Sequence, residues 1–589
     1  MRAAPVALTV LVDRARRRGL VATLHDPEEK AATISIRGVR LDSRLIEVGD
    51  LYFALPGSRV DGSVFVADAR RRGAAAVACD PAHVPEDLPA VVIDDVASAC
   101  GYLTSAFWQD PSDSVEVVGI TGTNGKTSCT YLLEAVWKAA GRRPGVIGTI
   151  SQRCAAFDRP SAMTTPSQVD LQALLAEMRA TGTDAVAMEV SSHALAQRRV
   201  AGCRFRAALF TNLTRDHLDY HDTEDSYFAA KASLFREWLV PGHGVAVLNA
   251  DDARVAKLAG ELSRHDVWTV STTPGVPARG YVVSASCTLA GIEAVFDLEG
   301  DRLSIRSPLV GAANLCNLLS VAALAMGTGV PAEAIRAGLA GCRAVPGRME
   351  KVLPARPVVA SPPPFVPAVP RPATPVLRSV PFGRASQFLM RPPAPAPRPA
   401  PAPPRPPEPV RSQAAGEDET AGLPIVFVDY AHTPDALERS LRALAGEVAG
   451  RVIVVFGCGG DRDRGKRPLM GRIAAELAKV VILTSDNPRS EEPHAILEEI
   501  EIGLGARLVR RSAAELAEPG TGGYLVEADR LVAIETAITI AAPDDLVLVA
   551  GKGHEDYQEI AGTKRHFDDR EVARTMLARR RDQASRASG

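Results

Sequence analysis

Long hydrophobic runs are missing from the sequence, which excludes one class of protein at the start. No stretch of about 18 consecutive apolar residues occurs in its 589 residues, so no transmembrane helix is predicted. The short apolar run near the N-terminus is followed, not preceded, by an arginine cluster, and no small-residue cleavage site comes after it. A secretory signal has the opposite order. We therefore expect a cytoplasmic protein that does not insert into a membrane.

Cysteine pairs and an excess of charge of one sign are also missing. The nine cysteines are scattered without a CxxC and their number is odd, which argues against a disulfide framework or a zinc site. The 68 basic and 70 acidic residues leave a net charge of −2, so nothing indicates a nucleic-acid partner. Only 10 of the basic residues are lysines, so a lysine within a motif suggests a role that arginine does not fill.

Proline is present in excess, but in one segment. Of the 44 prolines, 21 lie between Pro354 and Pro409. Proline fixes φ and lacks a backbone N–H, so this segment is not expected to form helices or a sheet. We predict a disordered or polyproline II insertion over residues 354–422. A docking tether for a partner that binds polyproline II is the alternative interpretation.

Outside that segment, apolar strands alternate with helices, as is typical of α/β proteins. The length alone suggests three or four domains. Residues 1–110 have short apolar runs between turn residues and are predicted to form a small α/β domain. Residues 111–345 and 346–589 carry strands that are apolar throughout, so each is expected to form a mostly parallel, doubly wound sheet. The predicted fold class is α/β with three domains, and the proline-rich insertion lies in the third.

Hydrophobic periodicity and proline positions locate the main helices. In the central domain we predict helices over 126–140, 168–179 and 224–239. In the C-terminal domain proline in the first turn indicates helices that begin at Pro434, Pro468 and Pro493.

The strongest single motif is GITGTNGKTS, which follows an apolar strand and opens a helix. Gly122 and Gly125 allow the backbone to fold around phosphates with its N–H groups pointing inward. Lys126 would place a charge on the outer phosphates, and the Thr127 hydroxyl suits Mg²⁺. Ile120 stands where the strict P-loop pattern has glycine, so an ordinary glycine turn is the alternative. The order of strand, turn and helix favours a nucleotide site.

Polar residues cluster where two further predicted strands end. Glu189 lies in MEVSSH, and His217 and His221 lie in TNLTRDHLDYH together with Asp216 and Asp219. Each residue alone would be read as part of a solvated loop or a helix cap. Because ligands bind at the carboxyl ends of parallel strands, two such clusters beside a phosphate loop favour a functional site. Glu189 would suit Mg²⁺, which prefers oxygen ligands.

Nine motifs together resemble those of the ATP-dependent Mur ligases of peptidoglycan synthesis. In chain order they are TGTNGKTS, MEVSSH, TRDHLDYH, GAANLCN, PGRME, VDYAHTPDAL, GCGGDRDRGKRPLM, SDNPR and GKGHE. The resemblance covers nearly the whole chain, from LDSR to GKGHE, and only the proline-rich segment interrupts it. It implies an N-terminal domain that binds the UDP substrate, a central ATPase domain and a C-terminal Rossmann-like domain that brings the incoming amino acid.

The resemblance also implies roles for individual residues. The implied ATP-binding residues are Gly122, Thr123, Asn124, Gly125, Lys126, Thr127, Ser128, Asn314, Asn317, Arg348 and Asp429. The implied magnesium ligands are Thr127, Glu189, His217 and Lys231, the last as a carbamate, and the catalytic group comprises Lys126, Lys231, Glu189 and His217. A carbamate turns a cation into an oxygen ligand, which arginine could not supply. As a lone residue, Lys231 would otherwise be read as an ordinary surface lysine.

Two further sets would hold the substrates. The UDP-muramoyl-peptide would be bound by Leu41, Ser43, Ser58, Arg59, Val60, Thr164, Thr165, Ser191, Gln197 and Arg199. Family members with DNPR add diaminopimelate, which would be bound by Arg462, Asp486, Asn487, Pro488, Arg489, Gly551 and Glu555. A guanidinium can grip the distal carboxylate with two hydrogen bonds, and carboxylates can hold the ammonium group. Both meso- and LL-diaminopimelate fit this pattern. By itself, DNPR would be read as a turn.

The resemblance implies an amide ligase that uses ATP and Mg²⁺. The D-glutamyl γ-carboxylate of the UDP-N-acetylmuramoyl-dipeptide would take the γ-phosphoryl group, and the amine of diaminopimelate would then displace phosphate. We expect a monomer whose partners are these small molecules. The alternatives are a related ligase (a lysine-adding member, MurF or a folylpolyglutamate synthase), a P-loop switch that does not ligate, and a scaffold built around the proline-rich segment.

Overall fold

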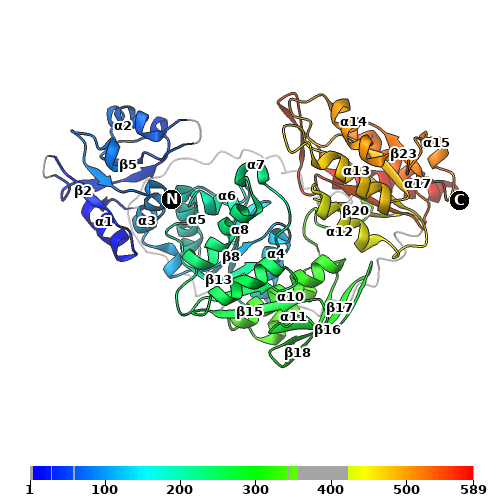
Figure 1. The fold of residues 1–589 in the computed structure, drawn as a ribbon, viewed down its shortest axis with the longest axis horizontal. Coiled ribbons are helices and arrows are strands. Elements are labelled where there is room, and N and C mark those ends of the chain that lie inside the picture. The colour runs from blue at the N-terminus through cyan, green and yellow to red at the C-terminus, as the bar shows by residue number, and fades with distance from the viewer. Residues whose placement is uncertain (1–3, 28–29, 58–59, 343, 356–421, 588–589) are drawn as a thin grey trace, which may run out of the picture.

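The computed structural model describes residues 4–27, 30–57, 60–342, 344–355 and 422–587. Three α/β units lie side by side in chain order along an elongated molecule (Figure 1). This confirms the predicted three-domain α/β fold class, whereas the predicted boundaries at residues 110 and 345 stay predictions. The predicted disorder and docking role of the proline-rich segment lie outside the described residues, apart from 354–355 and 422.

The N-terminal unit has a five-stranded sheet in the order β2-β7-β6-β5-β4. Its strands are β2 (Thr23–His25), β4 (Gly38–Arg40), β5 (Asp50–Phe53), β6 (Ala76–Cys79) and β7 (Ala90–Val92). Helices α1 (Leu8–Arg17) and α3 (Val96–Phe107) pack on one face, and α2 (Val66–Arg71) packs on the other. Only β2 runs antiparallel to its neighbour.

The central unit has an 11-stranded sheet with a parallel core. The parallel strands are β9 (Pro144–Ile147), β12 (Ala185–Glu189), β8 (Glu116–Thr121), β13 (Phe205–Phe210), β14 (Val245–Asn249) and β15 (Asp266–Ser271). The antiparallel strands β10 (Ser151–Cys154) and β11 (Phe157–Pro160) extend one edge. At the other edge β16 (Gly280–Thr288) pairs parallel with β15 and opens an antiparallel meander with β17 (Gly291–Leu298) and β18 (Asp301–Ser307). The prediction of a mostly parallel sheet is confirmed, but it did not include the β16–β18 meander, because the exposed strands β16 and β18 lack the continuous apolar runs of the core strands.

Helices cover both faces of the central sheet. On one face lie α4 (Lys126–Ala139), α10 (Ala312–Gly327) and α11 (Ala332–Gly341). On the other lie α5 (Gln168–Ala180), α6 (Ser192–Ala196) and α8 (Glu224–Ser233). The helix predicted over 224–239 changes character, because α8 gives way to a π-helical turn at Leu234–Trp238. Each fully buried Leu, Val or Phe side chain in these layers contributes about 1.5–3 kcal/mol.

The C-terminal unit has a six-stranded sheet in the order β19-β20-β24-β21-β22-β23. Its strands are β19 (Glu350–Val352), β20 (Ile425–Asp429), β21 (Val452–Phe456), β22 (Val480–Leu483), β23 (Gly523–Val526) and β24 (Leu546–Ala550). Strands β19 and β20 pair antiparallel, with Val352 opposite Val426. The proline-rich segment therefore interrupts a connection between two paired strands, as expected for an insertion.

Helices also cover both faces of this sheet. One face carries α12 (Pro434–Leu444), α13 (Lys466–Leu477) and α14 (Pro493–Leu504). The other carries α16 (Arg530–Ile540) and α17 (Asp569–Ala587). The predicted starts at Pro434 and Pro493 are confirmed. The third helix, α13, begins two residues before Pro468, at Lys466. Pro468 fits there because the N–H groups of the first turn have no partner within the helix, so its missing N–H costs no helix hydrogen bond.

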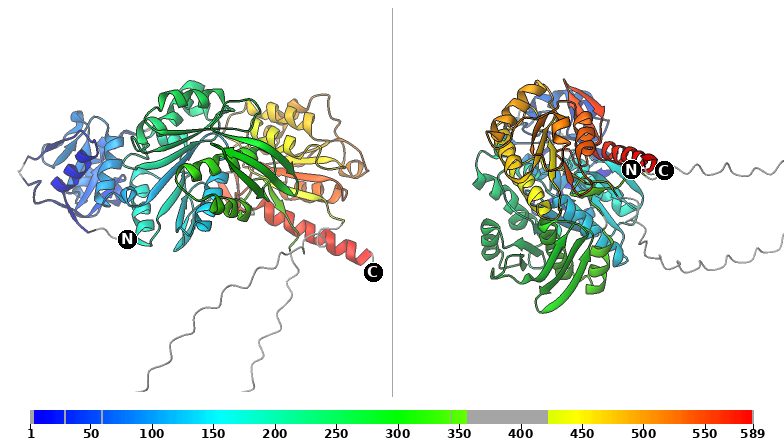
Figure 2. Two further views of the ribbon diagram at one scale, coloured as in Figure 1. Left: turned by 90° about the horizontal axis from the view of Figure 1, so that it is seen from below. Right: turned by 90° about the vertical axis from the view of Figure 1, so that its right-hand side faces the viewer.

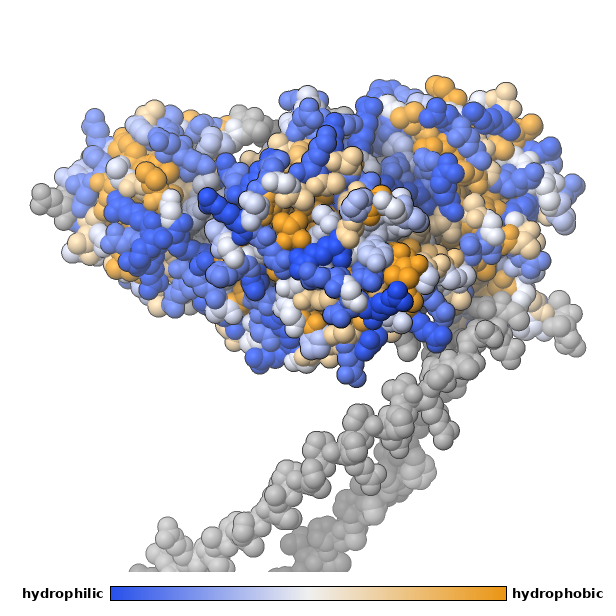
Figure 3. All heavy atoms as spheres, turned by 60° about the horizontal axis from the view of Figure 1, so that its bottom comes forward, coloured by the Kyte–Doolittle hydropathy of each residue, from blue (hydrophilic) through white to orange (hydrophobic). Residues whose placement is uncertain are grey.

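The outside of the molecule is mixed in character. Figure 2 shows the last turns of α17 extending away from the C-terminal unit, where its residues become exposed. On the face in Figure 3, hydrophobic residues form separate patches among hydrophilic ones. Among the described residues, no helix combines the length and hydrophobicity needed to cross a membrane.

Candidate active site

The predicted phosphate loop connects β8 to α4. Gly122 and Gly125 have φ angles of +137° and +88°, which favour glycine. Space is limited too, since a Cβ on Gly122 would lie 2.0 Å from Thr211 Oγ1. No side chain caps the first turn of α4, so its N–H groups are available to an anion.

Asn212, which the motif analysis did not single out, braces this loop. Its Oδ1 accepts from Asn124 N at 2.9 Å, its Nδ2 donates to Asn124 O at 3.1 Å, and its carbonyl accepts from Thr123 N at 2.9 Å. The sequence signal was its place two residues after the end of β13, at the carboxyl edge of the sheet.

Two lysine side chains converge on the loop. Lys126 Nζ and Lys231 Nζ each donate to Gly122 O at 2.9 Å. Lys231 is only 2% exposed, and its Nζ lies 4.5 Å from the centre of the Tyr227 ring. Burial lowers the pKa of both lysines, that of Lys231 well below its usual value, and the charge of Lys126 adds to the effect on Lys231. The Lys126 ammonium group and the backbone N–H groups of the loop make this a site for anionic oxygens, while Lys231 lies buried beside them.

The predicted magnesium ligands Thr127 and Glu189 lie together. Thr127 Oγ1 donates to Glu189 Oε2 at 2.9 Å, and Glu189 is 1% exposed. Thr149 fixes this carboxylate by donating from its N to Oε1 at 2.8 Å and from its Oγ1 to Oε2 at 3.1 Å. A hydroxyl and a buried carboxylate beside a phosphate loop fit the oxygen preference of Mg²⁺.

His217, also predicted as a magnesium ligand, lies further out. Its side chain is 45% exposed and pairs with Asp216 at 3.4 Å. Its ring lies 6.3 Å from that of Tyr227, whose hydroxyl is 3.2 Å from Thr123 Oγ1. Burial opposes ionisation of Asp216, but His217 and other nearby cations hold the pKa of Asp216 below its usual value. His217 thus borders the phosphate loop through Tyr227.

The remaining predicted ATP residues lie where the central and C-terminal units meet. Asn317 Nδ2 donates to Asn314 Oδ1 at 3.2 Å at the start of α10. Arg348 Nη2 approaches Thr127 Oγ1 at 3.4 Å, and its guanidinium lies 4.2 Å from the Tyr430 ring centre. Asp429 accepts from Met349 N, next to Arg348, at 2.9 Å, and burial raises the pKa of this carboxyl.

The phosphate loop itself also touches the C-terminal unit. Asn124 Nδ2 donates to Asp435 Oδ2, near the start of α12, at 3.2 Å. The predicted nucleotide-binding residues therefore come from both units.

The residues predicted to hold the muramoyl-peptide form a connected group in the central unit. Thr165 Oγ1 donates to Glu189 O at 2.9 Å and accepts from Ser191 N at 3.1 Å. Arg199 Nη1 donates to Thr165 O at 3.1 Å, and its Nε donates to Gln197 Oε1 at 2.9 Å. This group adjoins the strand that carries the buried carboxylate, so a bound carboxyl group could lie near the phosphates.

The other predicted substrate residues are spread more widely. Thr164 Oγ1 lies 3.1 Å from Thr149 Oγ1, beside the central group. Leu41 and Ser43 lie in the N-terminal unit directly after β4, with Ser43 5% exposed, while Val60 is 55% exposed. Ser58 and Arg59 lie outside the described residues.

The predicted diaminopimelate residues gather at the carboxyl ends of β22 and β24. Asn487 Nδ2 donates to Glu555 Oε2 at 2.9 Å. A Cβ on Gly551, whose φ is +115°, would lie 2.9 Å from Asp486 Oδ2. The sequence analysis missed Lys552, a fully buried lysine whose Nζ lies 3.1 Å from Glu555 Oε2 and 3.9 Å from Asp486 Oδ1. The scarcity of lysine was the signal that could have found it.

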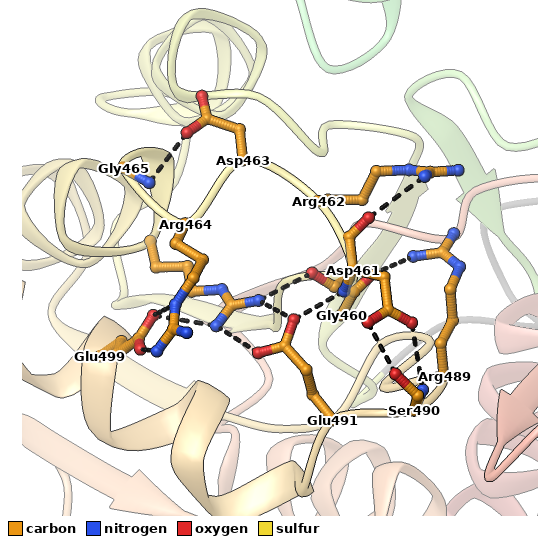
Figure 4. Close-up of polar contacts among 12 residues, drawn as sticks. Gly460, Asp461, Arg462, Asp463, Arg464, Gly465, Arg489, Ser490, Glu491 and Glu499 are labelled. Carbon is orange, nitrogen blue, oxygen red and sulfur yellow. Dashed lines mark hydrogen bonds and ion pairs between the residues drawn. The ribbon is translucent and has the colours of Figure 1, made fainter. Parts of the chain in front are cut away.

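Arg489 and Arg462 lie on adjoining loops of the same unit. Arg489 Nη1 donates to Gly460 O at 2.6 Å, and Arg462 Nη1 donates to Asp461 O at 3.2 Å. Figure 4 shows both guanidinium groups on the same side of the loop. Arg489 N also donates to Glu559 O at 3.1 Å, which ties Pro488 and Arg489 to the hairpin of β25 (Tyr557–Ile560) and β26 (Thr563–His566). Arginines and buried carboxylates thus share one site, which suits a zwitterion.

The three α/β units and the phosphate loop between two of them define a nucleotide-dependent, multidomain α/β enzyme. Family models give the same assignment: the Mur ligase middle domain matches residues 120–325, the catalytic domain of the Mur ligase family matches 35–108, and the Mur ligase glutamate ligase domain matches 411–553. The chain belongs to the Mur ligase family, which confirms the resemblance found in its motifs.

Individual members of the family are similar to this chain over nearly their full length. The UDP-N-acetylmuramoyl-L-alanyl-D-glutamate–2,6-diaminopimelate ligase of Gloeobacter violaceus is 41% identical over 550 residues, 93% of this chain and 95% of the relative. A solved structure of an enzyme with that name aligns with 98% of this chain and 99% of its own, at 27% identity and a TM-score of 0.62. MurF ligase from Thermotoga maritima, solved with ADP, shares the fold over 93% of this chain and 98% of its own, at 16% identity and a TM-score of 0.54.

Proposed function

We propose that this chain is an ATP-dependent ligase that joins diaminopimelate to the D-glutamyl γ-carboxylate of UDP-N-acetylmuramoyl-L-Ala-D-Glu, as a monomer, in cytoplasmic peptidoglycan precursor synthesis. One observation supports diaminopimelate as the amino acid that is added. Lys552 lies near Asp486 and Glu555, and Arg489 follows Asp486 in the same DNPR segment, so anionic and cationic groups lie on neighbouring segments of the C-terminal unit. The relatives named for diaminopimelate support the same choice.

The reaction couples ATP cleavage to amide formation. The γ-carboxylate attacks the γ-phosphorus of ATP, giving an acyl phosphate and ADP. The amine of diaminopimelate then attacks the acyl carbon, and the C–O bond to phosphate breaks while the amine loses a proton. Lys126 and the N–H groups at the start of α4 orient and stabilise the phosphoryl oxygens.

Mg²⁺ would be held by Thr127, Glu189, His217 and carbamylated Lys231, and it supplies charge neutralisation at the phosphates. The buried side chains of Thr127 and Glu189 fit this ion, as described above. Lys231 fits the carbamate because its Nζ is buried next to the phosphate loop, where an uncompensated cation is costly. The carbamate would replace that ammonium group with oxygen donors.

The amino acid would be held by opposite charges. The guanidinium groups of Arg489 and Arg462 grip the distal carboxylate, and Asp486 and Glu555 hold the ammonium group. Lys552 lies near both carboxylates, 3.9 Å from Asp486 and 3.1 Å from Glu555, and so partly compensates their negative charge. Asn487 fixes Glu555 through its hydrogen bond.

An amino-acid panel tests this proposal. Purified protein receives ATP, the muramoyl-dipeptide nucleotide and either meso-diaminopimelate, LL-diaminopimelate or lysine, and phosphate release is measured. We expect release with at least one diaminopimelate isomer and little with lysine. Equal release with lysine, or release without the nucleotide-peptide, would contradict the proposal.

A further inference from the structure

A network of charged groups ties the segment that carries Arg489 to the loop after β21 (Figure 4). Arg467, in the first turn of α13, donates from Nη1 to Glu491 Oε2 at 2.9 Å and from Nη2 to Glu491 Oε1 at 2.8 Å. Its Nη1 also donates to Glu499 Oε2 at 2.9 Å, and Glu499 pairs with Arg464 as well. The Arg467 side chain is 0% exposed, so these carboxylates compensate a charge that would otherwise be costly to bury.

Glu491, held by Arg467, also hydrogen-bonds the loop at residues 457–465, which we call the glycine loop. Its Oε1 accepts from Asp461 N at 2.6 Å. The Asp461 carboxylate in turn accepts from Ser490 N at 3.2 Å and from Ser490 Oγ at 2.7 Å. Hydrogen bonds from Arg467 lower the pKa of Glu491 to about 2, so this carboxyl is ionised at neutral pH. The glycine loop and the segment at residues 486–491 are therefore joined in both directions.

Both segments hold a residue in a costly backbone conformation. Asp461 and Arg489 have φ angles of +52° and +53°, in the left-handed region that favours glycine. Such conformations persist where surrounding contacts impose them, and they concentrate at functional sites. Here the Asp461 N–H is held by Glu491, and the Arg489 N–H and C=O are held by the β25–β26 hairpin.

Gly460 connects the network to the Arg489 side chain. Its N–H donates to Asn487 O at 2.9 Å, and a Cβ at this position would lie 2.0 Å from Pro488 O. Its carbonyl, next to the held Asp461 N–H, accepts from Arg489 Nη1. Within the described residues this is the one hydrogen bond of the Arg489 guanidinium, so its other N–H groups are available to a carboxylate.

We propose that Glu491, held by Arg467, is a positioning residue for amino-acid recognition: by fixing the Asp461 N–H, it orients the Gly460 carbonyl that anchors Arg489. The inference rests on the proposed function, because it concerns how Arg489 meets the distal carboxylate. Glu491 acts through Arg489 and touches no substrate itself. The same network would also stabilise the fold, so the test must separate the two roles.

A double-mutant cycle separates them. The variants are Glu491→Gln, Arg489→Ala and the double variant, with KM for diaminopimelate and for ATP measured on each. The matched control is Glu438→Gln, which removes a partner from the exposed pair with Arg442 on α12. Thermal unfolding of each variant reports the structural contribution.

We expect Glu491→Gln to raise KM for diaminopimelate roughly tenfold, as loss of a charged hydrogen bond would, and to leave KM for ATP unchanged. In the Arg489→Ala background the same substitution should add nothing. An unchanged KM for diaminopimelate, equal changes in both KM values, or additive effects would overturn the inference. If Glu491→Gln is too unstable to assay, Glu491→Asp carries the same test, because it keeps the charge beside Arg467 but shortens the side chain that reaches the Asp461 N–H.

The proposed function fails in a different way. If neither diaminopimelate isomer supports phosphate release by the wild type, the proposed function is contradicted, and so is the inference that rests on it. If the wild type uses diaminopimelate but the double-mutant cycle gives one of the contradicting results above, only the inference about Glu491 is contradicted.

Discussion

Two lysines that meet at the carbonyl of Gly122 have different environments and different proposed roles. Lys126 is partly exposed at the start of α4, where it can follow the phosphates. Lys231 is buried against the Tyr227 ring, and burial lowers its pKa well below the usual value. A neutral amine is the form that reacts with carbon dioxide, so this environment favours the proposed carbamate.

Lys231→Ala should therefore abolish ligation and leave the fold intact. Some activity should return when a short carboxylate such as formate or acetate is added, because it can supply the missing oxygens. Phosphate release with and without the added carboxylate measures this. Lys257→Ala, on the exposed side of α9 (Ala253–Leu258), is the control and should keep full activity. Full activity in Lys231→Ala would contradict the role.

The Arg467–Glu491 pair predicts a pH dependence of stability. A carboxyl whose pKa is lowered on folding stabilises the protein above its unfolded pKa, and this contribution is lost as the pH falls through the folded value. For Glu491 those values are 4.5 and about 2.

The free energy of unfolding lost in Glu491→Gln should thus be constant above about pH 6 and shrink as the pH falls from 4.5 towards 2. Denaturant titrations at several pH values measure it. Glu438→Gln should change the stability little throughout, because its pair is exposed. A loss in Glu491→Gln that grows as the pH falls would refute the assignment.

Helices α4 and α11 touch at a glycine, and this contact predicts a packing constraint behind the phosphate loop. A Cβ on Gly338 would lie 2.3 Å from Val136 Cα and 2.6 Å from Val136 N, which are backbone atoms that cannot turn aside. A Cβ on Gly341, in the same helix, would meet nothing within 4 Å.

Gly338→Ala should destabilise the protein by roughly 1–3 kcal/mol, as overpacking does in cores. Gly341→Ala should be neutral or slightly stabilising, since alanine favours helices. Thermal unfolding of the two variants side by side measures the difference. Equal stability of both variants would show that α11 can move away from α4.

The pairing of β19 with β20 predicts that the proline-rich segment between them can be shortened without loss of the fold. Val352 lies opposite Val426, so the strands are held in register on the two sides of the proline-rich segment. Replacing residues 356–421 with a flexible linker of about six residues should keep the fold and the ligase rate. Circular dichroism and phosphate release measure both. Loss of ligation in a folded variant would assign that segment a part in catalysis.

Over the whole molecule, the regular parts were predictable from the sequence and the contacts between distant segments were not. Apolar runs predicted the strands β8, β9, β12, β13 and β14, and first-turn prolines predicted the starts of α12 and α14. Exposed strands such as β16 have no comparable signal. Lys552 and Glu491 were missed because Asp486, near Lys552, and Arg467, which donates to Glu491, lie in distant segments that only the fold brings together.

The architecture divides the proposed reaction between two units. The central unit holds the phosphate loop and the buried Glu189, and the C-terminal unit holds the proposed amino-acid site at Asp486 and Arg489. Arg348 and the Asn124–Asp435 hydrogen bond connect them. In the proposed reaction the C-terminal site would therefore select the amino acid, and the phosphate loop would serve to activate the carboxyl group.

A competition experiment tests directly whether the C-terminal site selects the amino acid. The purified protein is given ATP, UDP-N-acetylmuramoyl-L-Ala-D-Glu and an equimolar mixture of lysine, meso-diaminopimelate and LL-diaminopimelate, and the product is identified by its mass. The diaminopimelate adduct should form almost exclusively in the wild type, and Arg489→Ala should lose that preference. A wild type that forms mainly the lysine adduct, or an Arg489→Ala variant with unchanged preference, would contradict the assignment of the C-terminal site.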